Sequence, residues 1–217
     1  MSHEIVVVDY HKGNLLSVAR SLSAVGAEVA ISDDPRTISE ARGVVLPGVG
    51  SFEDAMSYMR PSGQADAVVS SVQRGVPFLG ICLGLQLPFQ RGSELTSEAW
   101  GNGWCPGLGL LSGSVSRLES SRLKVPHVGW NQLHLTERGR QCPLLVDVPE
   151  GSNVYFTHSY APADDIDESI IATKTHYGRT FASTVWHENL FGVQFHPEKS
   201  SATGLRILSN FVCIVRG

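Results

Sequence analysis

A cysteine between two glycines is the first feature of the sequence that could do chemistry. The segment GICLG, residues 80–84, has the spacing of a nucleophile elbow, a sharp strand-to-helix turn that leaves no room for side chains two positions either side. We expect a strained backbone at Cys82 and a thiolate favoured by the start of the following helix. The amide of Leu83 would then face an oxyanion on an attacked carbonyl. The alternative is a buried structural cysteine with glycines beside it by coincidence.

A histidine and a carboxylate that could serve this cysteine lie together near the C-terminus. In FGVQFHPEKS, residues 191–200, His196 ends an apolar run, Pro197 interrupts regular pairing and Glu198 follows. A cysteine nucleophile needs a base, and the base needs a carboxylate that fixes its tautomer. Each residue alone also fits ordinary loop structure or a solvated surface. Together with the elbow, they indicate covalent catalysis at a carbonyl carbon.

A glycine-containing turn supplies a candidate for the remaining part of such a site. Gly48, Val49 and Gly50 follow an apolar run and Pro47. Glycines in a turn at the carboxyl end of a sheet can present backbone amides to an anion. The turn is therefore a candidate source of a second oxyanion donor, although a simple tight turn between strand and helix would have the same sequence.

Composition limits the kind of protein that positions these residues. The 217 residues suffice for one domain, which we expect to span residues 1–217. A net charge of −4 with scattered Lys and Arg argues against a nucleic-acid partner, and no stretch reaches the length of a membrane span. The N-terminal residues lack the basic start of a signal peptide, and the four cysteines lack metal-ligand spacing. We expect a cytoplasmic protein with reduced thiols.

The first half of the chain alternates between strand and helix patterns. Continuous apolar runs predict parallel strands that are buried on both faces. The expected strands are 4–10, 27–32, 43–48 and 76–82. Leu15, Val18, Leu22 and Val25 give the first helix an apolar face, with Asn14 placed to cap it and Gly26 to end it. Helices are also expected in SFEDAMSYMR and ADAVVSSVQRG after the third strand.

The second half, from about Leu108, resembles strands joined by short turns, with a hairpin tip at residues 187–189. A last helix would bring Leu205, Leu208 and Phe211 to one side. The sequence therefore predicts an α/β fold with a mostly parallel central sheet that is flanked by helices and extended by antiparallel strands in the C-terminal half.

The motifs GICLGLQ, LPGVGSF and FGVQFHPEKS together resemble those of the class I (triad) glutamine amidotransferases. Within that family the chain is most similar to the branch of glutaminase subunits of imidazole glycerol phosphate synthase. The similarity runs nearly end to end, through VVVDYHKGNLLSV, VPHVGWNQL, VYFTHSYAP and GLRILSNFV. The PGVG turn and HVGWNQ distinguish this branch from sister families.

The resemblance implies that the chain hydrolyses glutamine to glutamate and ammonia. Cys82 would attack the side-chain amide and form a γ-glutamyl thioester. His196 would act as general base and acid, oriented by Glu198. Leu83, with Gly48, Val49 and Gly50, would form the oxyanion hole, and the turn would need a peptide flip before it donates. Gln86, Thr157, His158 and Ser159 match glutamine-binding positions, although Gln86 could be a solvated helix residue and His158 a structural histidine.

The resemblance also implies a partner, a (β/α)8-barrel cyclase subunit that receives ammonia through an internal channel in a heterodimer of histidine biosynthesis. The expected interface residues are Asn14, Trp130, Asn131 and Lys199, with a core position as the alternative for Trp130. Glutaminase activity would stay slow until the cyclase carries its nucleotide ligand. We expect no metal and no cofactor, because the other histidines lack neighbouring ligands.

Two segments depart from the family pattern. Pro88 removes an amide bond to Gly84 and should kink the helix after the nucleophile, which could displace Gln86. The segment SEAWGNGWCPGLGLL, which includes Trp104 and Cys105, is expected to be a surface loop away from the triad.

Other functions remain open on the sequence alone. A paralogous glutaminase would supply ammonia to another acceptor, for instance in sugar amidation, and a γ-glutamyl peptidase would act on peptides without a partner. A redox protein or chaperone would not need Glu198 beside His196. A binding-only subunit would normally lack one of the three catalytic residues.

Overall fold

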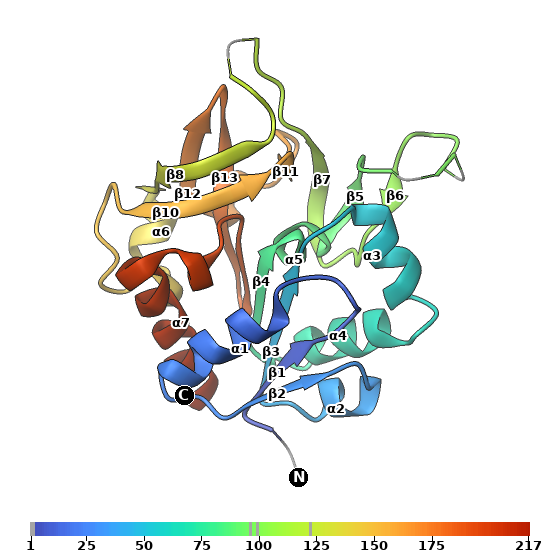
Figure 1. The fold of residues 1–217 in the computed structure, drawn as a ribbon, viewed down its shortest axis with the longest axis vertical. Coiled ribbons are helices and arrows are strands. Elements are labelled where there is room, and N and C mark those ends of the chain that lie inside the picture. The colour runs from blue at the N-terminus through green and yellow to red at the C-terminus, as the bar shows by residue number, and fades with distance from the viewer. Residues whose placement is uncertain (1–2, 96, 99, 122) are drawn as a thin grey trace.

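The structure is a computed structural model that describes residues 3–95, 97–98, 100–121 and 123–217, and its centre is an eight-stranded sheet (Figure 1). The strand order is β2-β1-β3-β4-β14-β13-β12-β9, and the first five run parallel. Their bounds are Val29–Ser32, Ile5–Val8, Gly43–Gly48, Phe78–Cys82 and Leu190–Val193. The antiparallel continuation is Arg179–His187, Ile171–Tyr177 and His134–Leu135. The expected fold class is confirmed.

The inner parallel strands β1, β3, β4 and β14 are buried along their whole length because the two faces of the sheet belong to two separate cores. Successive side chains of a strand point to opposite faces. Val7 and Ile81 accordingly join one core, while Val8 and Phe78 join the other. This explains why the runs show no alternation with polar residues.

Helices cover both faces of the sheet. α1 (Leu15–Ala24) and α7 (Ser201–Arg216) bury their apolar faces in the first core. α3 (Phe52–Met59) and α4 (Gln64–Gln73) pack into the second, as Figure 1 shows in blue-green on the opposite side. The short α2 (Pro35–Ser39), which the sequence analysis missed, joins the same face. Asp34 caps it by accepting from the amides of Arg36 and Thr37.

Not every C-terminal strand extends the central sheet. β8 (His127–Gln132) and β10 (Asn153–His158) form a two-stranded ribbon of their own. A third sheet has the order β11-β7-β5-β6, with bounds Tyr160–Pro162, Leu111–Arg117, Phe89–Gly92 and Cys105–Pro106. Alternation identifies strands but not their partners, so the sequence could not distinguish one sheet from three.

Two expectations about the helices α7 and α1 are corrected. Leu205 is 41% exposed, because α7 buries Gly204, Ile207, Leu208 and Phe211 at the spacing of a helical face. Asn14 occupies the N-cap position of α1 but makes no side-chain capping bond there.

Pro88 does not kink a helix, because α5 (Leu83–Gln86) has already ended one turn after the nucleophile. The chain continues into β5, and the carbonyl of Pro88 accepts from the amides of Leu110 and Leu111. Gln86 is therefore not displaced by a bent helix.

The segment around Trp104 and Cys105 is only partly a surface loop. Cys105 is buried in β6, whereas the guanidinium of Arg91 lies 4.5 Å from the centre of the Trp104 ring. All four cysteines are free thiols. Within the described ranges, none of the helices combines the length and hydropathy that a membrane span needs.

One short helix and three 3-10 turns complete the fold in the C-terminal half. α6 (Glu137–Arg140) follows β9, and 3-10 turns occupy Pro143–Leu145, Glu168–Ile170 and, as η3, Pro197–Lys199. η3 packs against β10 and α7, so the residues after β14 are held against the end of the central sheet.

Candidate active site

Cys82 lies at the carboxyl end of β4 in a backbone conformation that is rare for a residue with a side chain. Its φ and ψ are 55° and −109°. A Cβ at Gly80 would lie 2.2 Å from the carbonyl oxygen of Gly84, and one at Gly84 would lie 1.6 Å from that of Leu46. Both glycines are therefore required by backbone contacts, as an elbow demands. Because α5 is a single turn, however, its dipole can support a thiolate only weakly.

His196 and Glu198 form a buried pair directly after β14. Nδ1 of His196 lies 2.9 Å from Oε1 of Glu198, and both side chains are almost completely excluded from solvent. The carbonyl of His196 accepts from the hydroxyl of Ser200, and its amide donates to the carbonyl of Tyr155. These bonds fix the histidine from both sides. The ring nitrogen Nε2 has no hydrogen-bond partner among the described residues.

The surroundings of His196 favour its charged form. Burial disfavours an imidazolium, but Cys82 and Glu198 outweigh it and raise the pKa of His196 to about 9. Val193 pairs with Ile81 across the parallel strands β14 and β4, so His196 and Cys82 lie at the same edge of the sheet. The structure brings the three residues of the expected triad together from two distant parts of the chain.

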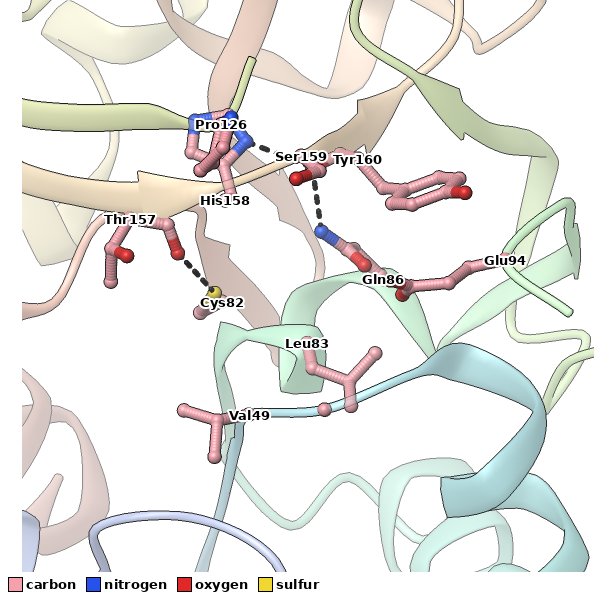
Figure 2. Close-up of a pocket in the computed structure, with 11 residues that line it drawn as sticks. Val49, Cys82, Leu83, Gln86, Glu94, Pro126, Thr157, His158, Ser159 and Tyr160 are labelled. Carbon is pink, nitrogen blue, oxygen red and sulfur yellow. Dashed lines mark hydrogen bonds between the residues drawn. The ribbon is translucent and has the colours of Figure 1, made fainter. Parts of the chain in front are cut away.

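The sulfur of Cys82 has two further polar neighbours. It lies 3.9 Å from the carbonyl oxygen of Thr157, as Figure 2 shows, and 3.5 Å from Nε2 of Gln194. Oε1 of Gln194 accepts from Nε2 of Gln86 at 2.9 Å, and Gln86 also donates to the carbonyl of Tyr160. Gln86 is therefore a buried residue of the site rather than a solvated one.

Gln194 was missed by the sequence analysis. It is fully buried and stands two residues before His196. A polar side chain inside the apolar run FGVQF was the available signal, because a buried amide must find partners.

A cavity of about 210 Å³ opens beside Cys82 (Figure 2). Its walls come from the elbow, the 48–50 turn and the end of β10. The lining residues are Val49, Gly50, Cys82, Leu83, Gln86, Glu94, Pro126, Thr157, His158, Ser159 and Tyr160. All four residues expected to bind substrate are among them.

Glu94 is the second residue that the sequence analysis missed. Figure 2 shows its side chain beside Gln86, on the wall that the residues after β5 provide. Its carboxylate accepts from the amide of Phe52, and burial raises the pKa of Glu94. A carboxylate here makes this end of the cavity suited to a cationic group. A glutamate in the segment RGSELTSE has no distinguishing sequence signal.

His158 is tied into a second histidine pair. Its Nδ1 lies 2.8 Å from the carbonyl oxygen of Tyr160 and its Nε2 lies 3.1 Å from Nδ1 of His127. Burial lowers the pKa of His158 to about 3 and that of His127 to about 4. Both rings are therefore neutral at pH 7. Among the described residues there is no cluster of His, Cys, Asp or Glu that could hold a metal ion.

The turn at residues 48–50 forms the opposite wall of the cavity. Gly48 pairs with Cys82 across β3 and β4, which brings the turn beside the nucleophile. Val49 is 43% exposed, and Gly50 has a φ of 103°. Leu83, which lies next to Gly48, is buried at the start of α5.

The residues expected at a partner interface lie on several elements. Trp130 is 55% exposed on β8, so the core alternative does not apply. Its ring and Nζ of Lys199 both approach the ring of Tyr155, at 6.0 Å and 5.8 Å. Asn131 is half-buried and donates to the carbonyl of His176, so its amide is already engaged within the chain. Asn14 is exposed at the start of α1, which neighbours η3.

A buried cysteine, histidine and glutamate at the carboxyl ends of parallel strands define a cysteine-dependent amide-cleaving class of site. The chain belongs to the glutamine amidotransferase class-I family, whose pattern matches residues 6–215. Two curated relatives carry the name imidazole glycerol phosphate synthase subunit HisH. The one from Gloeobacter violaceus is 48% identical over 96% of this chain and 88% of its own length. The one from Moorella thermoacetica is 46% identical over 98% of this chain and 95% of its own length.

Solved structures agree on the fold. A putative GMP synthase protein from Thermoplasma acidophilum superposes with a TM-score of 0.70 at 20% identity, covering 100% of this chain and 95% of that one. PurLQS from Thermotoga maritima also superposes with a TM-score of 0.70, at 19% identity, and the match covers 99% of each chain. At these identities the likeness concerns the architecture alone.

Proposed function

We propose that this chain is a glutaminase that supplies ammonia to a cyclase subunit making imidazole glycerol phosphate. The observation that carries the proposal is Cys82 on a strained elbow beside the buried His196–Glu198 pair. The match over residues 6–215 supports a single amidotransferase domain spanning residues 1–217. The curated relatives support the choice of acceptor.

In the first half-reaction, the thiolate of Cys82 attacks the side-chain carbonyl carbon of glutamine. The imidazolium of His196 gives its proton to the amide nitrogen, and ammonia leaves as the carbon–nitrogen bond breaks. Glu198 stabilises the imidazolium and fixes the ring through Nδ1, so Nε2 faces the reaction. The product is a γ-glutamyl thioester on Cys82.

In the second half-reaction, neutral His196 removes a proton from water, whose oxygen attacks the thioester carbonyl. The carbon–sulfur bond breaks and glutamate leaves, which restores the thiolate and the imidazolium. In both halves the amide of Leu83 and an amide from the 48–50 turn would stabilise the oxyanion. The 3.5 Å contact between Cys82 and Nε2 of Gln194 supplies a hydrogen-bond donor for the leaving sulfur.

The cavity beside Cys82 fits the amino-acid end of glutamine. Glu94 would pair with the α-ammonium group of glutamine, because Glu94 lines the cavity wall. Thr157, Ser159 and Gln86 would orient the rest of the substrate. His158 would shape the wall as a neutral ring, since the low pKa of His158 excludes acid–base work near pH 7.

The partner would be a (β/α)8-barrel cyclase, bound as a heterodimer in the cytoplasm. The names of the relatives support a second subunit. The exposed Trp130 and Lys199, which flank Tyr155, and Asn14 would form part of the contact surface. Since Asn131 is bonded within the chain, it would hold β8 in place more than it would contact the partner.

A comparison of nitrogen sources tests this function. The chain is combined with a barrel cyclase and its ribotide substrate, and product is measured with glutamine or with ammonium salt. Cys82→Ala should lower glutamine-dependent synthesis by more than about 10³-fold and leave ammonium-dependent synthesis unchanged, because only glutamine needs the nucleophile. Cys213→Ala, which changes an exposed cysteine on α7, is the matched control and should retain both activities.

Other outcomes separate the alternatives. Glutamine hydrolysis without product would indicate another acceptor. Cleavage of γ-glutamyl peptides in the absence of any partner would indicate a peptidase. Glutamine-dependent synthesis by Cys82→Ala would contradict the proposed mechanism.

A further inference from the structure

Tyr10 has a buried hydroxyl group with no hydrogen-bond partner among the described residues. The residue follows β1, and its side chain is completely excluded from solvent. Burial, with a smaller contribution from the charge of Cys82, raises the pKa of Tyr10, so the phenol remains protonated. A buried hydroxyl without a partner is unfavourable, and phenylalanine would fill the same space without that cost.

The hydroxyl lies against the turn that forms one wall of the active site. A Cβ built on Gly48 would lie 1.9 Å from the Tyr10 oxygen and 2.9 Å from Cβ of Leu83. Tyr10 belongs to the second core and does not line the cavity, whereas Val49 and Gly50 do. The hydroxyl is therefore placed behind the turn, on the side away from substrate.

The loop that carries Tyr10 also touches the turn from outside. A Cβ on Gly13 would lie 3.6 Å from Cα of Gly48 and 3.8 Å from the amide nitrogen of Val49. Gly50 in this turn is exposed and has a φ of 103°. The 48–50 turn, with its exposed Val49, is the neighbouring segment that can reorient.

Peptide geometry connects the hydroxyl to catalysis. In a trans peptide, the N–H and C=O groups point in opposite directions. If the peptide between Gly48 and Val49 directs its N–H into the cavity, its carbonyl must point away from the cavity. That is the side where the Tyr10 hydroxyl lies.

We propose that Tyr10 is a positioning residue, whose hydroxyl donates to the carbonyl of Gly48 when the amide of Val49 faces the substrate. The bond holds the second oxyanion donor in place, and the hydroxyl is unpaired only while the turn is in its present arrangement. This inference rests on the proposed role of the turn in carbonyl chemistry. Tyr10 itself touches neither substrate nor the reacting atoms.

Tyr10→Phe tests the proposal because it removes only the oxygen atom. In the complex of this chain with the cyclase and its nucleotide ligand, kcat for glutamine hydrolysis should fall about tenfold, or about 1.4 kcal/mol, with KM changed less than about twofold. The midpoint of thermal unfolding should stay the same or rise, since an unpaired buried hydroxyl is lost. A role in packing alone predicts unchanged kcat.

Tyr177→Phe is the matched control. The hydroxyl of Tyr177 donates to the carbonyl of Lys124 at 2.7 Å, so its loss should lower the unfolding midpoint and leave kcat unchanged. The two variants should thus show opposite patterns of stability and turnover.

A second reaction separates failure of this inference from failure of the proposed function. Cys82 can displace nitrophenolate from p-nitrophenyl acetate, forming an acetyl thioester that needs the same oxyanion donors but no glutamine. Slower nitrophenolate release by Tyr10→Phe supports the inference even if glutamine is not the substrate. The proposed role of Tyr10 would be overturned by an unchanged rate in this assay or by an unchanged kcat with glutamine. It would also be overturned if kcat fell together with a changed KM and a lower stability.

Discussion

Two groups of buried histidines in this chain differ in charge although they differ little in burial. His196 is 3% exposed, His158 6% and His127 2%. The pKa of His196 is raised to about 9, whereas those of His158 and His127 are lowered to about 3 and 4. Burial opposes the charged form in all three. The difference comes from the neighbours, a thiol and a carboxylate in one region and a carbonyl and a second imidazole in the other.

The difference in pKa gives the histidines around the active site different roles. A protonated histidine can donate its proton to the departing ammonia. A histidine that stays neutral can only form part of the pocket wall and make hydrogen bonds. The aromatic rings of Phe156 and Tyr177 stack on His127 at centroid distances of 4.7 Å and 3.9 Å, which suits an uncharged ring. The catalytic and structural histidines are thus distinguished by contacts.

Replacing Glu198 should make the pKa of His196 more like those of His127 and His158, and it is the change around these histidines from which we expect the largest effect. Glu198→Gln removes one of the two groups that raise the pKa of His196, so this pKa should fall although Cys82 still raises it. We expect kcat/KM for glutamine to fall on the order of 10³-fold. We expect activity to decline at high pH as His196 loses its proton near pH 9, and in the variant this decline should move to lower pH in a full pH–rate profile.

The surface offers a matched control for this change. Nδ1 of His134 lies 2.8 Å from Oε1 of Glu150, the same type of contact in an exposed place. Glu150→Gln should leave the pH–rate profile unaltered. If Glu198→Gln retained the wild-type profile, the proposed orienting role would be wrong.

The buried pair of His127 and His158 should make the stability of the fold sensitive to acid. We expect this effect to be smaller than that of Glu198→Gln. His127 and His158 have pKa values below that of an unfolded histidine, so the unfolded state binds more protons as the pH falls below about 6.5. Between pH 7 and pH 5 we expect a loss on the order of 2 kcal/mol in the free energy of unfolding. His196 acts in the opposite direction and contributes stability that is lost as the pH rises through about 9.

Denaturant unfolding at several pH values measures this effect. His127→Phe retains an aromatic ring between Phe156 and Tyr177 and removes one titrating group, so the slope of stability against pH should decrease. His134→Gln, at an exposed position, should leave the slope as in the wild type. An equal acid slope in His127→Phe would contradict the assignment.

Much of this arrangement could be predicted from the sequence, because the relevant signals are local. Continuous apolar runs identified the parallel strands, and the glycines around Cys82 identified a turn that the backbone contacts of Gly80 and Gly84 require. The proximity of His196 and Glu198 followed from two residues of separation. Their approach to Cys82 depends on the pairing of β14 with β4, which no local pattern specifies.

What the sequence did not reveal depends on long-range contacts. Glu94 looks ordinary until the fold places it beside Gln86, and the position of Gln194 in an apolar run indicates burial but not its partners Cys82 and Gln86. The division into three sheets, the short α5 and the buried position of Cys105 likewise depend on which segments pair. Tyr10 gives no sequence signal, because only the absence of a partner among the described residues of the folded chain makes its hydroxyl unusual.

The most direct test of the account is to identify the atom that attacks glutamine. An electrophilic diazoketone analogue of glutamine is incubated with the chain in complex with the cyclase, and the labelled peptide is located by mass spectrometry. We predict one label per chain, on the sulfur of Cys82, in proportion to lost activity and suppressed by excess glutamine. Inactivation with the label on another residue, or full labelling of Cys82 with glutaminase activity retained, would contradict the account.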